Sequence, residues 1–212
     1  MAQEKMTVHK ALCELKTLDA RITKGTQKAF VFANKHSNTK IGGTDLKAYC
    51  SEIVDAYKSA TDLMARRDAI KRAVTMSNAV TTVTIGGVTY TVAEAIEMKN
   101  HGIPMKQALL NKLTSALQRA RVEAEKANGD ALSRRADEYV IALYGNADMK
   151  NASDDIKKTR DEFIASQTVE VVDPIKATSE VQRLDDEISA FTTEIDSALS
   201  VSNALTELDI SY

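Results

Sequence analysis

The chain has 212 residues, with 28 basic and 30 acidic side chains, a net charge of −2, 5% aromatic residues, eight glycines and two prolines. This near balance of charge argues against a dedicated nucleic-acid-binding protein, which usually carries a clear basic excess. No run approaches about 18 consecutive apolar residues, so no membrane span is expected. The scarcity of helix breakers and of aromatic residues predicts a mainly α protein with long helices.

The first two predicted helices each carry one apolar seam. Apolar residues spaced by three and four from Val8 to Ile22 predict the first helix. Residues 30–43 are interpreted as a loop or a weak hairpin, and Thr44 is expected to cap a second helix. Its seam continues to Val74, which corresponds to about 45 Å at 1.5 Å per residue. Such a length is typical of coiled coils and helical hairpins.

A change of period from 3.6 to 2 follows the second helix. Residues 80–85 are nearly all β-branched, and a second β-branched run over 88–92 follows Gly86-Gly87. Two such runs around a Gly-Gly turn predict an antiparallel hairpin of type I′ or II′. Thr91 and Glu94 then form a capping-box pattern, so a helix is expected to begin directly after the hairpin.

The remainder of the chain is also expected to be helical. Helices are predicted over about 104–128, 132–145 and 153–164. Val169–Val172 is a candidate for a short strand. Asp173-Pro174 has the pattern of a cap followed by proline in the first turn, which predicts the start of the last helix.

One short pattern occurs twice, 125 residues apart. Ser77–Ile85 reads SNAVTTVTI and Ser202–Ile210 reads SNALTELDI, with five of nine positions identical. We interpret both copies as a seam-bearing helix that runs directly into a strand. We therefore expect a strand at about 206–212 to pair with the hairpin, Val169–Val172 to add a further strand, and the two preceding helices to lie side by side. Two alternatives remain: the strand pairs with another subunit, or Ser-Asn-Ala is simply a common helix exit.

The predicted fold is therefore mainly α. It consists of long antiparallel helices, resembling a helical bundle or coiled coil, with a small antiparallel β-sheet built on a hairpin at about 80–92. We expect one elongated domain over residues 1–212, with a C-terminal strand at about 206–212. The residues expected to organise the sheet and the assembly are Val83, Ile85, Gly86, Gly87, Val88, Tyr90, Leu208, Ile210 and Tyr212.

A search for chemical motifs predicts neither a catalytic nor a metal site. His9 and Cys13 share a helix face, but zinc requires two further ligands at matching spacing. Adjacent carboxylates such as Asp154-Asp155 and Asp185-Asp186 point about 100° apart on a helix, so they do not form a paired-carboxylate site. Cys13 and Cys50 are expected to be free, partly buried thiols. No cofactor is expected, and an enzyme is the minority interpretation.

Three segments carry a resemblance to a known group of proteins. DLMARRDAIK at 62–71, SNAVT at 77–81 and VAEAIEMK at 92–99 resemble virion structural proteins of large tailed bacteriophages. The resemblance covers roughly residues 60–100. It implies a non-enzymatic subunit of the tail, baseplate or neck, made in the host cytoplasm and located in the virion. The implied partners are copies of the chain itself and other virion proteins.

Other functions remain open at this point. A weaker likeness links the chain to small helical bacterial proteins of the septicolysin-like group, although the long C-terminal half departs from them. The first alternative function is a cytoplasmic helical adaptor that binds a partner through an exposed seam. The second is a pore-forming toxin or an enzyme.

Overall fold

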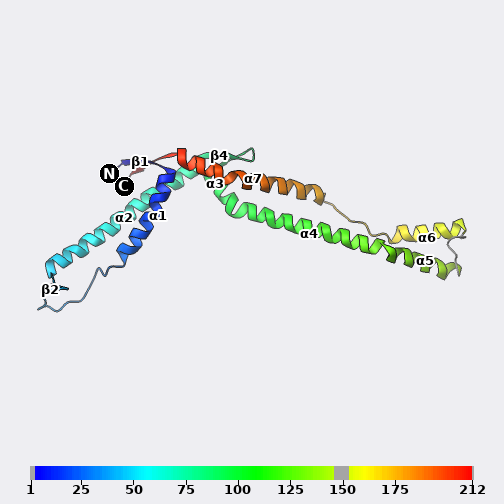
Figure 1. Ribbon diagram of the computed structural model, residues 1–212, viewed down its shortest axis with the longest axis horizontal. Helices are drawn as coiled ribbons and strands as arrows, with labels where there is room; N and C mark the ends of the chain where they lie inside the picture. Colours follow the sequence, from blue (N-terminus) through cyan, green and yellow to red (C-terminus); the bar gives the residue numbers. More distant parts are fainter. Residues whose placement is uncertain (1–2, 146–152, 212) are drawn as a thin grey trace. The chain divides into compact units, whose positions relative to one another are not determined.

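The computed structural model describes residues 3–145 and 153–211 of the chain. The protein is mainly helical with small antiparallel strand pairs, which confirms the predicted fold class (Figure 1). Its contacts divide the chain into two compact units. Unit 1 comprises Met1–His101 with Ala190–Tyr212, and unit 2 comprises Gly102–Ser189. This division differs from the expected single domain over 1–212, because residues 102–189 pack mainly among themselves.

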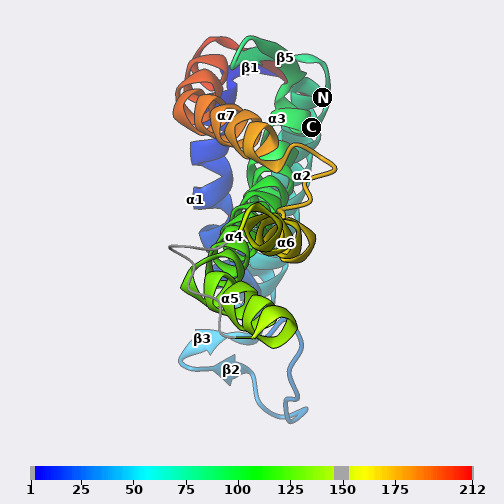
Figure 2. The same ribbon diagram turned by 90° about the vertical axis from the view of Figure 1, so that its right-hand side faces the viewer.

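Unit 1 is built on an antiparallel pair of helices, α1 (Val8–Thr26) and α2 (Leu46–Val80), which lie side by side (Figure 2). The predicted seam of α1 faces this contact, since Leu15 and Leu18 are buried in one core with Ile70 of α2. We had expected α2 to lie beside the last helix. The described contacts pair it with α1 instead, because the apolar seams of these two helices face each other.

A loop with a short strand pair connects α1 to α2. Its strands, β2 (Lys40–Ile41) and β3 (Thr44–Asp45), are antiparallel, in line with the interpretation of residues 30–43 as a loop or weak hairpin. Phe30 of the loop packs edge-to-face against Tyr57 of α2, with ring centroids 5.5 Å apart. This aromatic contact holds the loop against the helix.

The predicted hairpin at 80–92 is confirmed. It consists of β4 (Thr82–Ile85) and β5 (Val88–Thr91) in antiparallel register. The turn residues Gly86 and Gly87 have φ values of 57° and 76°. Positive φ at both central residues defines the type I′ turn, which glycine adopts without steric strain.

A short helix follows the hairpin, as expected. Helix α3 (Val92–Glu97) begins at a capping box. The backbone N–H of Glu94 donates to the Thr91 side-chain oxygen, and the backbone N–H of Thr91 donates to the Glu94 carboxylate. A π-helical turn, Met98–Gly102, follows it. The capping box satisfies two backbone donors that the start of the helix would otherwise leave without partners.

The last helix, α7 (Ala177–Leu205), begins three residues after the predicted Asp173-Pro174 start. The Asp173 carboxylate accepts the backbone N–H of Ala177 at 2.8 Å, so the aspartate still acts at the helix start. From Ala190 onward α7 belongs to unit 1. There Phe191 packs edge-to-face against Tyr90 of the hairpin, with centroids 5.8 Å apart.

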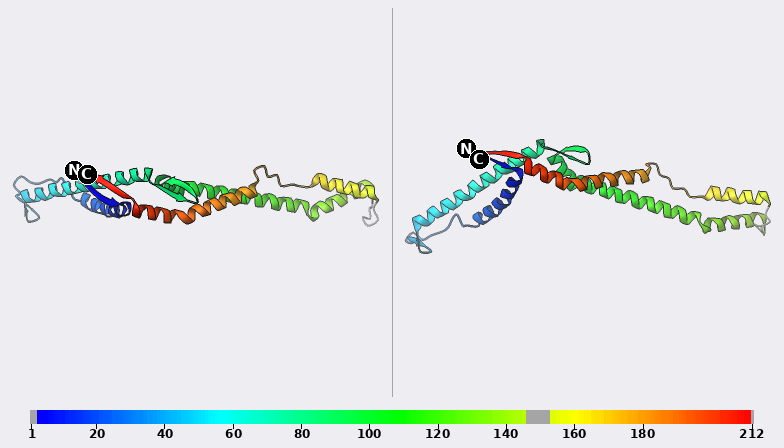
Figure 3. Two further views of the ribbon diagram at one scale, coloured as in Figure 1. Left: turned by 90° about the horizontal axis from the view of Figure 1, so that it is seen from above. Right: turned by 45° about the horizontal axis from the view of Figure 1, so that its top comes forward.

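The two ends of the described chain pair with each other. Strand β1 (Gln3–Thr7) lies beside β6 (Glu207–Ser211) at the two ends of the chain (Figure 3). The two strands are antiparallel, with Lys5 opposite Asp209. The predicted strand at about 206–212 is thus present, but its expected pairing was wrong. Its partner is the N-terminal strand and not the hairpin, because the apolar face of β1 completes the same core as that of β6.

The expectation of one shared sheet was wrong as well. Within the described residues the strands form three separate two-stranded sheets, β1–β6, β2–β3 and β4–β5. Val169–Val172 forms no strand. The Asn128 side chain donates to the Val169 carbonyl and accepts its N–H, both at 2.8 Å. It thereby occupies two backbone groups that a neighbouring strand would use.

Unit 2 contains smaller clusters of apolar residues. Its helices are α4 (Ile103–Asn128), α5 (Asp130–Tyr144), α6 (Asp154–Gln167) and the first part of α7. Leu110 of α4 is buried with Leu184 and Ile188 of α7. Helix α6 lies along α5, where Phe163 stacks on Tyr139 with centroids 4.6 Å apart. These contacts explain why residues 102–189 form a unit of their own.

Candidate assembly surface

The terminal strand pair β1–β6 covers the core formed by α1 and α2. Alternate residues point inward, so Met6, Leu208 and Ile210 are each at most 4% exposed. Lys5 and Asp209 lie on the opposite, solvent-exposed face. This period-2 alternation determines which side chains stabilise the unit and which remain free for other contacts.

The backbone register leaves two open strand edges. The Val8 N–H donates to the Thr206 carbonyl at 2.9 Å, which makes these two residues a hydrogen-bonded pair. Bonded and non-bonded pairs alternate in an antiparallel ladder. The pairs Lys5–Asp209 and Thr7–Glu207 are therefore non-bonded, and their backbone groups point away from the partner strand. Each strand thus presents outward N–H and C=O groups, as edge strands do.

An ion cluster fixes β1 to the helix pair. The Arg66 guanidinium of α2 donates from Nη2 to Glu4 Oε2 of β1 at 2.9 Å and to Glu14 Oε2 of α1 at 3.0 Å. Arg66 Nε also donates to Glu14. The hydrogen bond from Arg66 is the main reason that the pKa of Glu4 lies below its ordinary value. The cluster ties three elements together, which makes it a structural feature of the surface.

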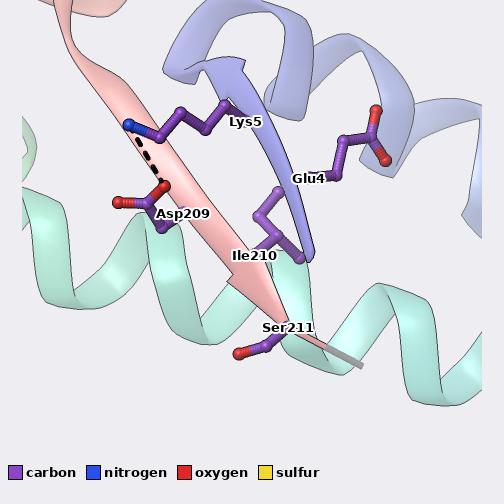
Figure 4. Close-up of a pocket in the computed structure, with 5 residues that line it drawn as sticks. All are labelled: Glu4, Lys5, Asp209, Ile210 and Ser211. Carbon is purple, nitrogen blue, oxygen red and sulfur yellow. Dashed lines mark ion pairs between the residues drawn. The ribbon is translucent and has the colours of Figure 1, made fainter. Parts of the chain in front are cut away.

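A shallow hollow is lined by residues of both strands of the pair β1–β6. Its lining residues are Glu4, Lys5, Asp209, Ile210 and Ser211, and the Lys5 Nζ lies 3.7 Å from Asp209 Oδ1 (Figure 4). The side chains of Lys5 and Asp209 are 72% and 82% exposed. A pair this exposed contributes little to stability, and its charges remain available to a partner.

A groove of about 480 Å³ runs between β6 and α2. Four apolar residues of α2, spaced by 4, 3 and 4 positions, form a stripe along it, which we call the α2 stripe: Ala69, Ala73, Met76 and Val80. Met76 and Val80 are 64% and 73% exposed. Its other wall is the segment from Thr206 to Ser211, which includes β6. Because no lining residue comes from β1 or α1, we place the groove at the outer edge of β6.

The predicted organising residues lie in two different sheets. In the hairpin, Val83 and Ile85 are buried, whereas Val88 is 52% exposed. In β6, Leu208 and Ile210 are buried in the unit 1 core. Gly86 and Gly87 form the hairpin turn, Tyr90 contacts Phe191, and Tyr212 lies outside the described residues. The buried side chains therefore hold the chain itself together and are not free to contact a partner.

Sequence reasoning missed two parts of this surface. No element was predicted for the residues of β1, which precede the expected helix from Val8, although Met6 and Val8 alternate with polar residues. The α2 stripe was masked by the deeper seam through Ile70 and Val74. The 4, 3, 4 spacing was present in the sequence and was the signal that would have identified the stripe.

Among the described residues, no group of three or more histidine, cysteine or acidic side chains is arranged to hold a metal ion. His9 Nε2 lies 3.9 Å from Cys13 Sγ. Cys13 and Cys50 are free, as expected, but both are exposed and not partly buried, because they lie on the outward faces of α1 and α2.

No helix in the described residues combines the length and the apolar character needed to cross a bilayer. Comparisons with models of protein families, with curated proteins and with solved structures gave no match.

Proposed function

We propose that this chain is a non-enzymatic structural subunit of a bacteriophage particle, in the tail, baseplate or neck. It assembles with copies of itself and with other virion proteins through helical seams and strand edges. The observation that carries the assembly role is the amount of surface the chain exposes. The assignment to a phage particle rests on the resemblance of residues 60–100.

The exposed surface of the chain is 14816 Å². A compact monomer of 23.2 kDa exposes about 9,700 Å². Two separate compact proteins of the sizes of unit 1 and unit 2 would expose about 11,600 Å². The excess of about 3,000 Å² falls within the roughly 2,000–5,000 Å² that permanent assemblies bury. Assembly would remove such an excess from water.

Part of this surface is apolar and lies along the long helices. On α2, Val54 is 63% and Tyr57 is 57% exposed. On α4, Met105 is 70% and Leu109 is 48% exposed. Single exposed apolar side chains are common, but residues that share one helix form the continuous contacts that subunit interfaces use. This distribution favours a subunit over a free-standing monomer.

The assembly role is tested by size-exclusion chromatography with light scattering across a range of concentrations. We expect species larger than a monomer, and assembly that weakens in Val54→Glu. The matched control is Ser59→Glu, which adds the same charge at another exposed position of α2, about 140° around the helix. A wild-type chain that stays monomeric at every concentration would contradict the assembly role.

The phage assignment needs a separate measurement. Particles of the phage that encodes the chain should contain it when they are purified to homogeneity and analysed by mass spectrometry. Its absence from intact particles, together with its presence in the infected-cell extract, would refute the virion assignment. That result would favour the adaptor alternative.

A further inference from the structure

We infer that copies of this chain join head to tail by strand addition, with β1 of one copy pairing with the outer edge of β6 of the next. This inference rests on the proposed assembly function and specifies the contact that drives it. The sheet β1–β6 then continues as β1–β6–β1–β6 through successive copies. The outer edge of β6, the α2 stripe and the exposed charges of both strands support this pairing.

The hydrogen-bonding capacity of the two outer edges is complementary. On β6, the backbone groups of Glu207 and Asp209 point outward, and on β1 those of Lys5 and the N–H of Thr7 do so, whereas the Thr7 carbonyl accepts the first hydrogen bond of α1 as its N-cap. An incoming β1 in the register used within the chain places its Lys5 opposite Asp209. In this new pairing the Lys5–Asp209 pair is hydrogen-bonded, whereas within the chain it is non-bonded. One register therefore serves both sides of β6 without turning any side chain to the other face.

The charges on the strands favour this pairing over symmetric ones. The exposed face of β6 carries Glu207 and Asp209, and the exposed face of β1 carries Lys5. Pairing β6 with β6 would bring acidic side chains opposite each other, and pairing β1 with β1 would do the same for Lys5. Like charges directly opposite destabilise a strand pair, whereas opposite charges stabilise it. The second copy is therefore expected to present β1 to β6.

The groove provides space and apolar surface beside the same edge. Because β1 continues into α1 at Val8, an added strand brings the first turn of α1 from the second copy to the end of the groove. There Met76 and Val80 of the α2 stripe are 64% and 73% exposed. Strand addition with an adjoining apolar pocket is a recurring mode of recognition, in which the backbone provides affinity and the pocket provides specificity.

A contact between two different surfaces of the same chain does not close upon itself by symmetry. Each copy retains one free β1 edge and one free β6 edge, so assembly produces rings or filaments. This property makes the contact testable by blocking one edge at a time. Proline at a residue whose N–H points outward removes a donor from the edge and leaves the ladder within the chain intact.

The experiment uses two full-length variants, Lys5→Pro and Glu207→Pro, each of which blocks one edge. We expect each variant alone to be monomeric by light scattering. Their equimolar mixture should form a discrete 1:1 dimer, because one open β1 edge and one open β6 edge remain. Circular dichroism melts confirm that each variant is folded. Assembly of both variants to the wild-type extent would overturn strand addition while leaving the proposed function intact, whereas a monomeric wild type would overturn both.

Charge variants keep the inference testable if either proline variant does not fold. Lys5→Glu and Asp209→Lys each replace an opposite-charge pair with a like-charge pair, so each should assemble at about tenfold higher concentration. Their mixture should assemble at a lower concentration than either variant alone, because residues 5 and 209 carry opposite charges at every contact between the two variants, while the like-charge pair within each chain is the same in all three samples. Asp161→Lys, which makes the same change of charge at an exposed position of α6, is the control. Unchanged assembly of both variants would overturn the inference.

Discussion

The hairpin turn allows a quantitative test, because its two glycines differ in one contact. Gly86 and Gly87 both have positive φ, so an added Cβ strains either position by about 1–2 kcal/mol. A Cβ on Gly86 would also lie 3.3 Å from the Ala190 Cβ, whereas a Cβ on Gly87 meets nothing within 4 Å. We expect Gly87→Ala to lower the free energy of unfolding by about 1–2 kcal/mol and Gly86→Ala by about 1 kcal/mol more.

Urea titration followed by far-UV circular dichroism measures these losses, and hydrogen exchange of the hairpin amides locates them. Ala190→Gly removes the opposing methyl group and costs about 1 kcal/mol by itself, as glycine does within a helix. The double variant Gly86→Ala with Ala190→Gly should lose less free energy of unfolding than the two single variants added together. We expect this difference to be about 0.5–1 kcal/mol. Equal losses at Gly86 and Gly87, with no coupling to Ala190, would refute the close approach of the turn to α7.

Two further predictions concern the terminal strand and the capping box. Ile210→Ala should lower the free energy of unfolding by about 2–4 kcal/mol, because Ile210 is 2% exposed in the unit 1 core. The control, Asp209→Ala on the exposed face, should change this free energy by no more than about 0.5 kcal/mol. Similar urea midpoints for the two variants would show that β6 does not close this core. The backbone and side-chain hydrogen bonds from Thr91 lower the pKa of Glu94, so its stabilisation is present above the ordinary pKa and is lost as the pH falls through the lowered one. Glu94→Gln should therefore flatten the loss of stability below about pH 5, and an unchanged pH profile would contradict this role of the carboxylate.

Local patterns predicted the helices and the hairpin well, because each of their signals lies within a short stretch of chain. The seam of α1 and the Gly86-Gly87 turn need no information from distant residues. The partner of β6 could not be found in the same way, because β1 lies about 200 residues away and has a short apolar signal centred on Met6. An alternating pattern indicates that a segment is an extended strand, but the pattern does not identify the strand with which that segment pairs.

Val169–Val172 is a segment for which a strand was predicted but is not formed. Its β-branched composition predicted a strand, yet the side chain of Asn128, 41 residues earlier in the sequence, occupies the N–H and C=O of Val169. The candidate assembly surface was predicted only in part. The strand β6 was expected, whereas the α2 stripe lay within a helix whose seam through Ile70 and Val74 had been assigned to the core. Which of two stripes faces inward depends on tertiary packing, which periodicity alone does not determine.

The pairing of β1 with β6 has a consequence for the timing of synthesis. Ribosomes add about 5–20 residues per second, so about 10–40 s separate the synthesis of Thr7 from that of Glu207. Throughout this interval β1 has no strand of its own chain to pair with, and β6 does not yet cover its side of the core between α1 and α2. In the proposed assembly, the nascent chain therefore offers its neighbours no β6 edge until translation has passed residue 211.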